Sequence, residues 1–269
     1  TITRIDGWGV WIWGEDNYVA NNDISRVFAV SSGDADAIRF FGAGHEFRNN
    51  YIHDIYEADA GPNREPPHSD CFQTFDLKGT YPALENVVIA GNVCSTDRHG
   101  VIMTQLMGAP AANIRIENNV FLSDGVAAVL LLGDGVGPAE QYRGITIANN
   151  IVTGVVEFHG IQATNGAGVT IVNNLFFGDF EPFSGPSLED GRGSYTTNNL
   201  VATAQDFTNV DDPDVRRRFR LSESSKAIDT GLDDFAPDID KDGRDRPVDG
   251  NDDGKPVSDL GPYEYTPSK

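Results

Sequence analysis

The chain has 269 residues, of which 39% are hydrophobic, and its 41 acidic residues against 20 basic ones give a formal net charge of −21. A surface of this sign repels nucleic acid and anionic membranes, and no run of about 18 apolar residues predicts a membrane span. We therefore expect neither a nucleic-acid partner nor insertion into a membrane.

In chain order, the most regular feature is an Asn-Asn pair with an apolar residue just after it. The pairs lie at residues 21–22, 49–50, 118–119, 149–150, 173–174 and 198–199, and Gly91-Asn92 is a degenerate copy. The second residues of successive copies are 28, 42, 27, 31, 24 and 25 positions apart. Internal periods of this length indicate an architecture in which similar units stack on one another.

Each period holds short apolar segments and no segment long enough for a helix. In one period they are residues 113–116 before the pair, 120–122 after it and 129–132 further on. Segments that alternate or are continuously apolar over so few residues are typical of strands. Three of them in about 25 residues leave no room for the crossover helix of a βαβ unit. The pattern predicts a chain that winds into stacked three-strand coils.

The Asn pairs suit the bends of such a coil. Asn adopts the left-handed conformation at low cost, and its amide can donate to one neighbouring coil and accept from the other, so we expect a ladder of Asn side chains. In these pairs and in coil length, residues 1–204 resemble the pectate-lyase-like superfamily. The resemblance implies an all-β, right-handed parallel β-helix, a fold that hosts lyases, hydrolases, epimerases, esterases and phage spikes.

The regularity breaks at the 42-residue step, where the excess lies in residues 57–67 and 76–82. A second long excursion, at residues 133–143, leaves the equivalent position two coils later. Loops that leave a rigid scaffold commonly carry function. We expect these loops to wall a groove along one face.

Five ionisable residues meet at that edge when the coils are aligned by their third strand. His68 and Asp70 lie on one rung, and Asp97, Arg98 and His99 lie on the next. Because adjacent rungs are about 4.8 Å apart, we predict that these residues form a catalytic centre for general acid–base chemistry. The alternative is a hydrogen-bond network that only braces the two loops.

Other polar residues near this edge are expected to bind substrate. They are Arg64, Gln73, Lys78, Tyr142 and His159.

Two kinds of polysaccharide chemistry fit the predicted centre. A lyase or C5-epimerase needs a base near C5 of a uronate and a cation for its carboxylate, roles open to His68 or His99 and to Arg98. A glycoside hydrolase needs two carboxylates, for which Asp70 and Asp97 are candidates. The sequence lacks the paired Asp-Asp and the Arg-Ile-Lys element of polygalacturonases, and the arginine-rich signature of common pectate lyases.

We therefore expect an extracellular or cell-surface enzyme that acts on a polysaccharide, with lyase or epimerase ahead of hydrolase. The alternative is a non-catalytic β-helix that binds glycans or belongs to a surface or phage-like assembly. The printed sequence starts in strand-like alternation with no capping segment, which favours part of a longer chain or a homo-oligomer.

After residue 204 the repeat stops, and residues 205–269 are expected to form an acidic capping segment packed on the helix. Its Ala-Ile-Asp, Asp-Gly-x-x-Arg-Pro and Asp-Leu-Gly-x-Tyr-Glu elements resemble the C-terminal closure of secreted bacterial β-helix proteins. Four carboxylates match ligand positions of a calcium loop, so we expect a structural Ca²⁺ ion. They are Asp238, Asp240, Asp242 and Asp249. The alternative is an acidic turn paired with Arg244 and Arg246.

Cys71 and Cys94 lie 23 residues apart, which is about one coil. We expect two separate buried thiols, because Cα atoms more than about 7 Å apart cannot be bridged. A disulfide between neighbouring strands is the alternative.

Overall fold

The computed structural model describes residues 1–29, 33–55, 68–75, 80–104, 111–123, 127–132, 142–154, 159–163, 168–184 and 195–267, with residues 104, 132, 159, 160, 162, 163 and 184 described by their backbone alone. These residues form parallel strands that repeat in groups of three along the chain. Helical structure in the described part is limited to the short 3₁₀ helices η2 (Ala204–Asp206), η3 (Val215–Arg217) and η4 (Asp233–Phe235).

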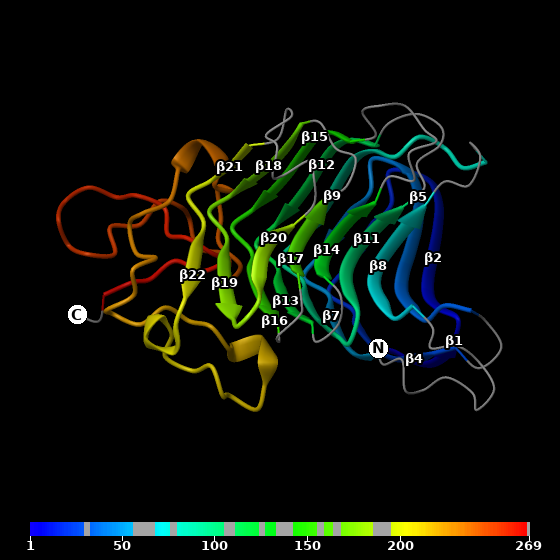
Figure 1. Ribbon diagram of the computed structural model, residues 1–269, viewed down its shortest axis with the longest axis horizontal. Helices are drawn as coiled ribbons and strands as arrows, with labels where there is room; N and C mark the ends of the chain where they lie inside the picture. Colours follow the sequence, from blue (N-terminus) through cyan, green and yellow to red (C-terminus); the bar gives the residue numbers. More distant parts are fainter. Residues whose placement is uncertain are drawn as a thin grey trace.

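The strands stack into three faces of a parallel β-helix (Figure 1). The first face holds β1 (Ile2–Asp6), β4 (Asp23–Phe28), β7 (Tyr51–Ile55), β10 (Val93–Thr96), β13 (Val120–Ser123), β16 (Ile151–Gly154), β19 (Leu175–Gly178) and β22 (Leu200–Ala202). The second face holds β2 (Trp8–Glu15), β5 (Asp36–Ala43), β8 (Asp70–Phe75), β11 (His99–Thr104), β14 (Ala127–Leu132), β17 (His159–Ala163) and β20 (Glu181–Ser184). The third face holds β3 (Tyr18–Ala20), β6 (Glu46–Arg48), β9 (Glu85–Ala90), β12 (Ala111–Glu117), β15 (Tyr142–Ala148), β18 (Val169–Val172) and β21 (Tyr195–Thr197).

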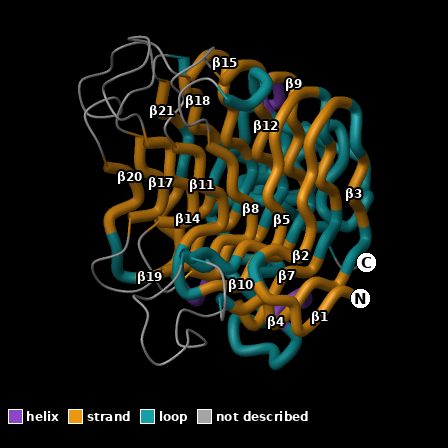
Figure 2. Tube along the Cα trace, turned by 90° about the vertical axis from the view of Figure 1, so that its right-hand side faces the viewer, coloured by secondary structure: helices purple, strands orange, loops and turns teal. Residues whose placement is uncertain are grey.

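Each strand inside a face pairs with its equivalents one coil earlier and one coil later, and the first and last described strands of a face pair with one neighbouring coil. Figure 2 shows the second-face strands side by side, from β2 to β20. The expected all-β parallel β-helix is therefore confirmed. Register between coils decides which side chains meet, because equivalent positions on adjacent strands lie about 4.8 Å apart.

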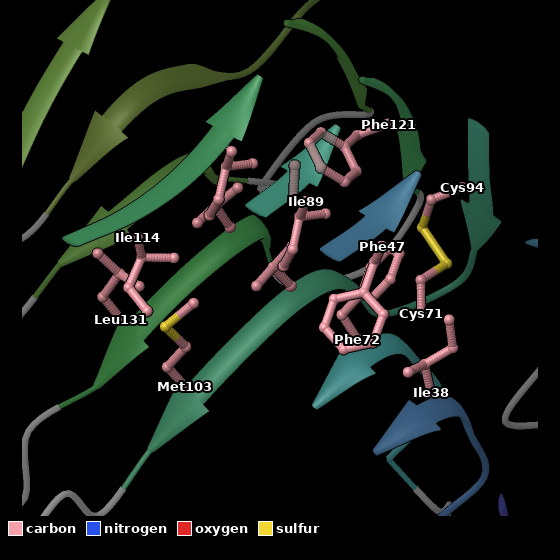
Figure 3. Close-up of a cluster of buried hydrophobic side chains, with 14 of the residues drawn as sticks. Ile38, Phe47, Cys71, Phe72, Ile89, Cys94, Met103, Ile114, Phe121 and Leu131 are labelled. Carbon is pink, nitrogen blue, oxygen red and sulfur yellow. A yellow bond between two sulfur atoms is a disulfide. The ribbon is translucent and has the colours of Figure 1, made fainter. Parts of the chain in front are cut away.

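The core fills the inside of the coils with side chains from all three faces. Phe47, Phe72 and Phe121 are buried there and come from the third, second and first face respectively (Figure 3). Alternating residues of each strand point inward because side chains alternate along a strand. A long apolar interior of this kind holds the outward-facing residues of each coil in fixed positions.

A disulfide joins Cys71 on β8 to Cys94 on β10, with the two Cα atoms 6.1 Å apart. The expectation of two separate thiols is therefore wrong. The residues lie on different faces of successive coils, and the chain turns a corner of the helix between those faces, which brings the two Cα atoms within bridging range. The bond lies inside the core, next to Phe72 (Figure 3).

The Asn pairs form the predicted ladder at the corner between the third and first faces. The first Asn of each complete pair has a positive φ of 51–58°. The second Asn donates from Nδ2 to Oδ1 of its equivalent in the next coil, at distances of 2.9–3.1 Å from Asn22 through to Asn199. Each pair thus combines a bend residue with a ladder residue, as the spacing predicts.

The C-terminal segment packs along the side of the helix. Phe207, Phe219 and Tyr263 join Ile151 and Leu175 of the first face in a second apolar cluster. The first Asn residues of several pairs donate to main-chain carbonyls of the segment, as Asn118 does to Ile239, Asn173 to Leu232 and Asn198 to Thr230. The Asn corner therefore binds the tail as well as the neighbouring coils.

Candidate active site

The candidate site lies at the start of three consecutive strands of the second face. Asp70 on β8 pairs in register with His99 on β11. One coil earlier, Arg39 on β5 pairs with Gln73. Just before these strands begin, the backbones of Asp34 and His68 form an isolated parallel β-bridge. The stacking of coils therefore brings residues about thirty positions apart in the chain into side-by-side contact.

His99 and Asp70 form a buried hydrogen-bonded pair. Nδ1 of His99 lies 2.7 Å from Oδ1 of Asp70, and the two residues are 3% and 0% exposed. In the tautomer that carries its proton on Nδ1, this nitrogen donates to the carboxylate of Asp70, and the lone pair of the ring lies on Nε2. Nε2 is buried and has no hydrogen-bond partner among the described residues. Gln73 completes the arrangement by donating from Nε2 to Oδ2 of Asp70, at 3.1 Å.

A second buried carboxylate, Asp36, lies beside this pair on β5. Its Oδ2 accepts a hydrogen bond from Nε of Arg39 at 2.7 Å, and the same guanidinium donates to Asp34 at 2.6 Å. The Arg39 guanidinium also lies over the rings of Trp8 and Phe75, at 4.8 and 5.2 Å from their centroids. Such contacts fix the cation and its carboxylates in one geometry.

Burial raises the pKa of Asp36 well above its ordinary value, and the nearby charge of Asp70 raises this pKa further. Arg39 acts in the opposite direction, through its charge and its hydrogen bond, but does not cancel the rise. A buried carboxyl group with a raised pKa, Asp36, therefore lies next to the His99–Asp70 pair. That combination is what proton transfer to and from a substrate requires.

Asp34, Asp36 and Arg39 are site residues that the sequence reasoning missed. Their pattern, Asp34-x-Asp36-x-x-Arg39, repeats the positions of His68-x-Asp70-x-x-Gln73 one coil later. Alignment of the first complete coils, rather than a search around the long loops, would have found them.

The structure places the other predicted catalytic residues at the rim of this centre. His68 is exposed, and its ring centroid lies 6.2 Å from that of His99. Asp97 is half-buried and accepts a hydrogen bond from Ser69 at 2.6 Å. Arg98 is also half-buried, and its main-chain N–H donates to Thr96. These three residues lie next to the His99–Asp70 pair, whereas Gln73 is hydrogen-bonded to it.

The predicted substrate-binding residues have mixed outcomes. Gln73 belongs to the centre, whereas Arg64 and Lys78 lie outside the described residues. The backbone of His159 pairs with Ala127 at the start of β17, on the same row as His99, and its side chain is not described.

Tyr142 is not at the surface, and its assignment to substrate binding is wrong. Its side chain is fully buried in the core, and its hydroxyl donates to the carbonyl of Met103 at 2.8 Å. As the first residue of β15, it points inward because of the alternation of that strand.

The tail carboxylates predicted to bind calcium make protein contacts instead of converging. Asp240 accepts hydrogen bonds from the main-chain N–H groups of Asp242, Arg244 and Glu264, and Asp242 is paired with Arg220. In the part of the chain that the structure describes, no three His, Cys, Asp or Glu side chains are grouped to hold a metal ion.

The other two predicted calcium ligands, Asp249 and Asp238, also make hydrogen bonds within the protein. Asp249 accepts main-chain hydrogen bonds from Asp253 and Gly254, and Asp238 accepts one from Arg246 through its carbonyl. Calcium binding by these residues stays a prediction from the sequence pattern.

A concave surface of about 730 Å³ lies elsewhere, between the third face and the tail. Its lining includes Arg48, Arg115 and Lys241, but Arg48 pairs with Glu46 and Arg115 with Glu117. The cations of this surface are thus largely neutralised. The surface contains no histidine and lacks the acid–base combination found on the second face.

The fold is a parallel β-helix that carries a cluster of buried ionisable side chains on its second face. A family model described as a right-handed β-helix region matches residues 1–176, and the chain belongs to this family. Proteins of this fold are commonly carbohydrate-active. Neither the curated proteins nor the solved structures contain a match to the chain. In the described residues, no helix is long and apolar enough to cross a membrane.

Proposed function

We propose that this protein is an extracellular, polysaccharide-active enzyme whose acid–base centre is formed by His99, Asp70 and Asp36. The observation that carries the proposal is the buried His99–Asp70 pair, in which a carboxylate orients an imidazole whose other nitrogen is unpartnered among the described residues. A carboxylate in this position fixes the tautomer and the orientation of the ring, which suits Nε2 to act as a general base.

The reaction favoured by this arrangement is β-elimination or C5 epimerisation of a uronate unit. In both, Nε2 of His99 takes the proton from C5, and the electron pair moves toward the uronate carboxyl group. In elimination, the C4–O bond then breaks and the leaving oxygen needs a proton, which protonated Asp36 can supply. In epimerisation, the C4–O bond stays intact, and protonated Asp36 returns a proton to C5 from the side opposite His99. The raised pKa of Asp36 supports the acid role.

A glycoside hydrolase is the second candidate within the same class. Asp36 and Asp70 are buried carboxyl groups on adjacent strands. They are close enough for the charge of Asp70 to raise the pKa of Asp36. One protonated and one ionised carboxyl group are the parts that hydrolysis needs. The release of reducing ends without an unsaturated product would identify this reaction.

The disulfide supports the extracellular part of the proposal. Cys71 and Cys94 are bridged, and structural disulfides form and persist in oxidising surroundings rather than in the cytosol.

The formal net charge of −21 would repel an anionic glycan at long range. The proposal therefore requires a local cation, and we propose Arg98, which is half-buried and directly precedes His99, for this role.

The alternative is a β-helix that binds glycans without turnover or has a structural role in a surface or phage-like assembly. The burial of Asp36, Asp70 and His99 favours this alternative, because a buried network can serve only to hold adjacent coils together.

A glycan panel separates these functions. Polygalacturonate, alginate and a neutral β-glucan are each incubated with the protein, with and without EDTA, and both ultraviolet absorbance of an unsaturated product and reducing ends are followed. We expect turnover of a uronate-containing glycan that His99→Ala abolishes. The matched control is His53→Ala, since His53 also contacts carboxylates, those of Asp23 and Asp54, but lies on the first face. No product from any glycan by either readout would overturn the enzymatic proposal.

A further inference from the structure

All three tryptophans of the chain, Trp8, Trp11 and Trp13, lie on one strand, β2. Trp11 is 46% exposed and Trp13 is 56% exposed. Such large apolar side chains are normally withdrawn from water, and neighbouring exposed ones mark a surface that binds something. Both belong to the second face, which also carries the candidate active site.

Neighbouring aromatic rings hold these two indoles in place. The ring centroid of Trp13 lies 5.1 Å from that of Tyr81, and Tyr81 stacks on Phe41 at 4.0 Å. Trp11 makes an edge contact with Trp8 at 4.4 Å. Because contacts of this kind restrict ring rotation, the indoles form a pre-organised surface, and a ligand does not have to order them.

The indole surface is continuous with the acid–base centre. Trp11 pairs in register with Arg39, and Arg39 pairs with Gln73, which contacts Asp70. Two strand spacings, or about 10 Å, therefore separate the rung of Trp11 from that of Gln73. A polymer lying across the strands of the second face would meet the indoles and the His99–Asp70 pair with nearby units of the same chain.

The charge of the protein narrows the choice of ligand. With a formal net charge of −21, the chain repels a second copy of itself, a nucleic acid and, at long range, an anionic glycan, so binding at the indoles has to come from uncharged parts of the ligand. The ligand must offer a flat, uncharged apolar surface for the indoles and polar groups for the adjacent Arg39, Asp34 and Asp36. A pyranose ring does both, because its axial C–H groups form an apolar face and its hydroxyl groups form a polar rim.

We propose that Trp11 and Trp13 form a subsite that stacks against pyranose rings of the polysaccharide, beside the reacting unit. This inference rests on the proposed function for its substrate class, but it concerns binding and not turnover.

Intrinsic fluorescence tests the subsite, because every tryptophan of the chain lies on β2, Trp11 and Trp13 in the subsite and Trp8 next to Arg39. The probes are oligogalacturonate, oligoalginate and a cello-oligosaccharide, titrated into the wild-type protein and into His99→Ala, which keeps the indoles. We expect at least one probe to shift or quench the emission of both proteins. Trp11→Ala and Trp13→Ala should each raise the Kd for that probe about tenfold.

The matched control is Tyr195→Ala, since Tyr195 is 52% exposed but lies on the third face. It should bind as the wild type does, and retardation in glycan-containing native gels provides a second readout for every variant. Loss of binding in the tryptophan variants, together with no turnover of any glycan, would support the subsite while contradicting the proposed enzyme. The subsite is overturned when no probe changes the emission or the gel mobility, when both tryptophan variants bind normally, or when light scattering shows a second copy covering β2.

Discussion

Nδ1 of His99 and Oδ1 of Asp70 lie 2.7 Å apart although the residues are 29 positions apart in the chain. The contact exists because one winding of the helix places β11 directly on β8, with these two residues in register. Since the core fixes both strands, the geometry of the pair is set by the fold rather than by loop conformation.

The Asn ladder should be a main source of stability. Asn150 donates from Nδ2 to Asn174 at 3.0 Å and to the carbonyl of Ile116 at 2.8 Å. Asn150→Asp keeps the shape but removes these donors inside the protein, so we expect a loss of about 3 kcal/mol or more in the free energy of unfolding. Denaturant titration measures it. Asn113→Asp is the control, because Asn113 donates only to the exposed Asn86 and should cost less than about 1 kcal/mol.

The disulfide should stabilise the protein because it closes a loop between residues that are 23 positions apart in the chain. Replacement of Cys71 and Cys94 by Ser should lower the free energy of unfolding by about 3 kcal/mol, because the unfolded chain gains conformational freedom. Denaturant titration checks this value. A thiol titration of the unreduced, denatured protein should find no free cysteine, and two titrating thiols would contradict the bridge.

Stability should fall as pH rises toward neutrality because of the buried tail carboxyl group of Asp259. Burial, followed by the charge of Glu264, raises the pKa of Asp259 to about 7. The unfolded group has a pKa of about 3.9, so between about pH 4 and 7 the folded chain holds a proton that the unfolded chain has released, and the free energy of unfolding declines.

Denaturant titration from pH 5 to 8 measures how the free energy of unfolding declines with pH. In Asp259→Asn this decline should be smaller by on the order of 2 kcal/mol. Asp234→Asn, at an exposed tail position, should leave the slope unchanged. An equally steep decline in Asp259→Asn would assign the effect to other groups.

Calcium binding by the tail, predicted from the spacing of its carboxylates, is open to a direct test. The pattern predicts that Tm rises on titration with CaCl₂ and falls with EDTA, and that Asp242→Asn removes this response. Asp234→Asn again serves as the control. A Tm that is unchanged by calcium, with no heat in calorimetry, would leave Asp240 as an acceptor of main-chain N–H groups only.

The sequence predicts the coil architecture well because an Asn pair, or its copy Gly91-Asn92, marks the corner between the third and first faces in successive coils. Once the bends are placed, register follows, and the contact of Asp70 with His99 could be predicted from their positions on adjacent rungs. Tyr142 was misplaced because it begins a strand, and which way a first residue points depends on where the alternation starts. The disulfide could not be predicted because it depends on how close the corner between two faces brings Cys71 and Cys94. Spacing along the chain does not specify that distance.

Asp36 and Arg39 show a different reason for failure. Neither residue lies near a long loop, and nothing in the local sequence of β5 marks these polar groups as buried. Their burial and mutual contact result from the stacking of β2, β5 and β8. Sequence reasoning that compares equivalent positions in every coil, including regular ones, is the way to recover such residues.

The measurement that tests the central claim most directly is the turnover of Asp70→Asn on the glycan found in the panel. Asn keeps the shape of the side chain but does not orient and stabilise a protonated His99, so we expect kcat to fall by about 10²- to 10⁴-fold in a protein that remains folded. Asp54→Asn, which alters the other His–Asp contact at His53, should retain full activity. Wild-type turnover in folded Asp70→Asn would show that the buried pair only braces adjacent coils.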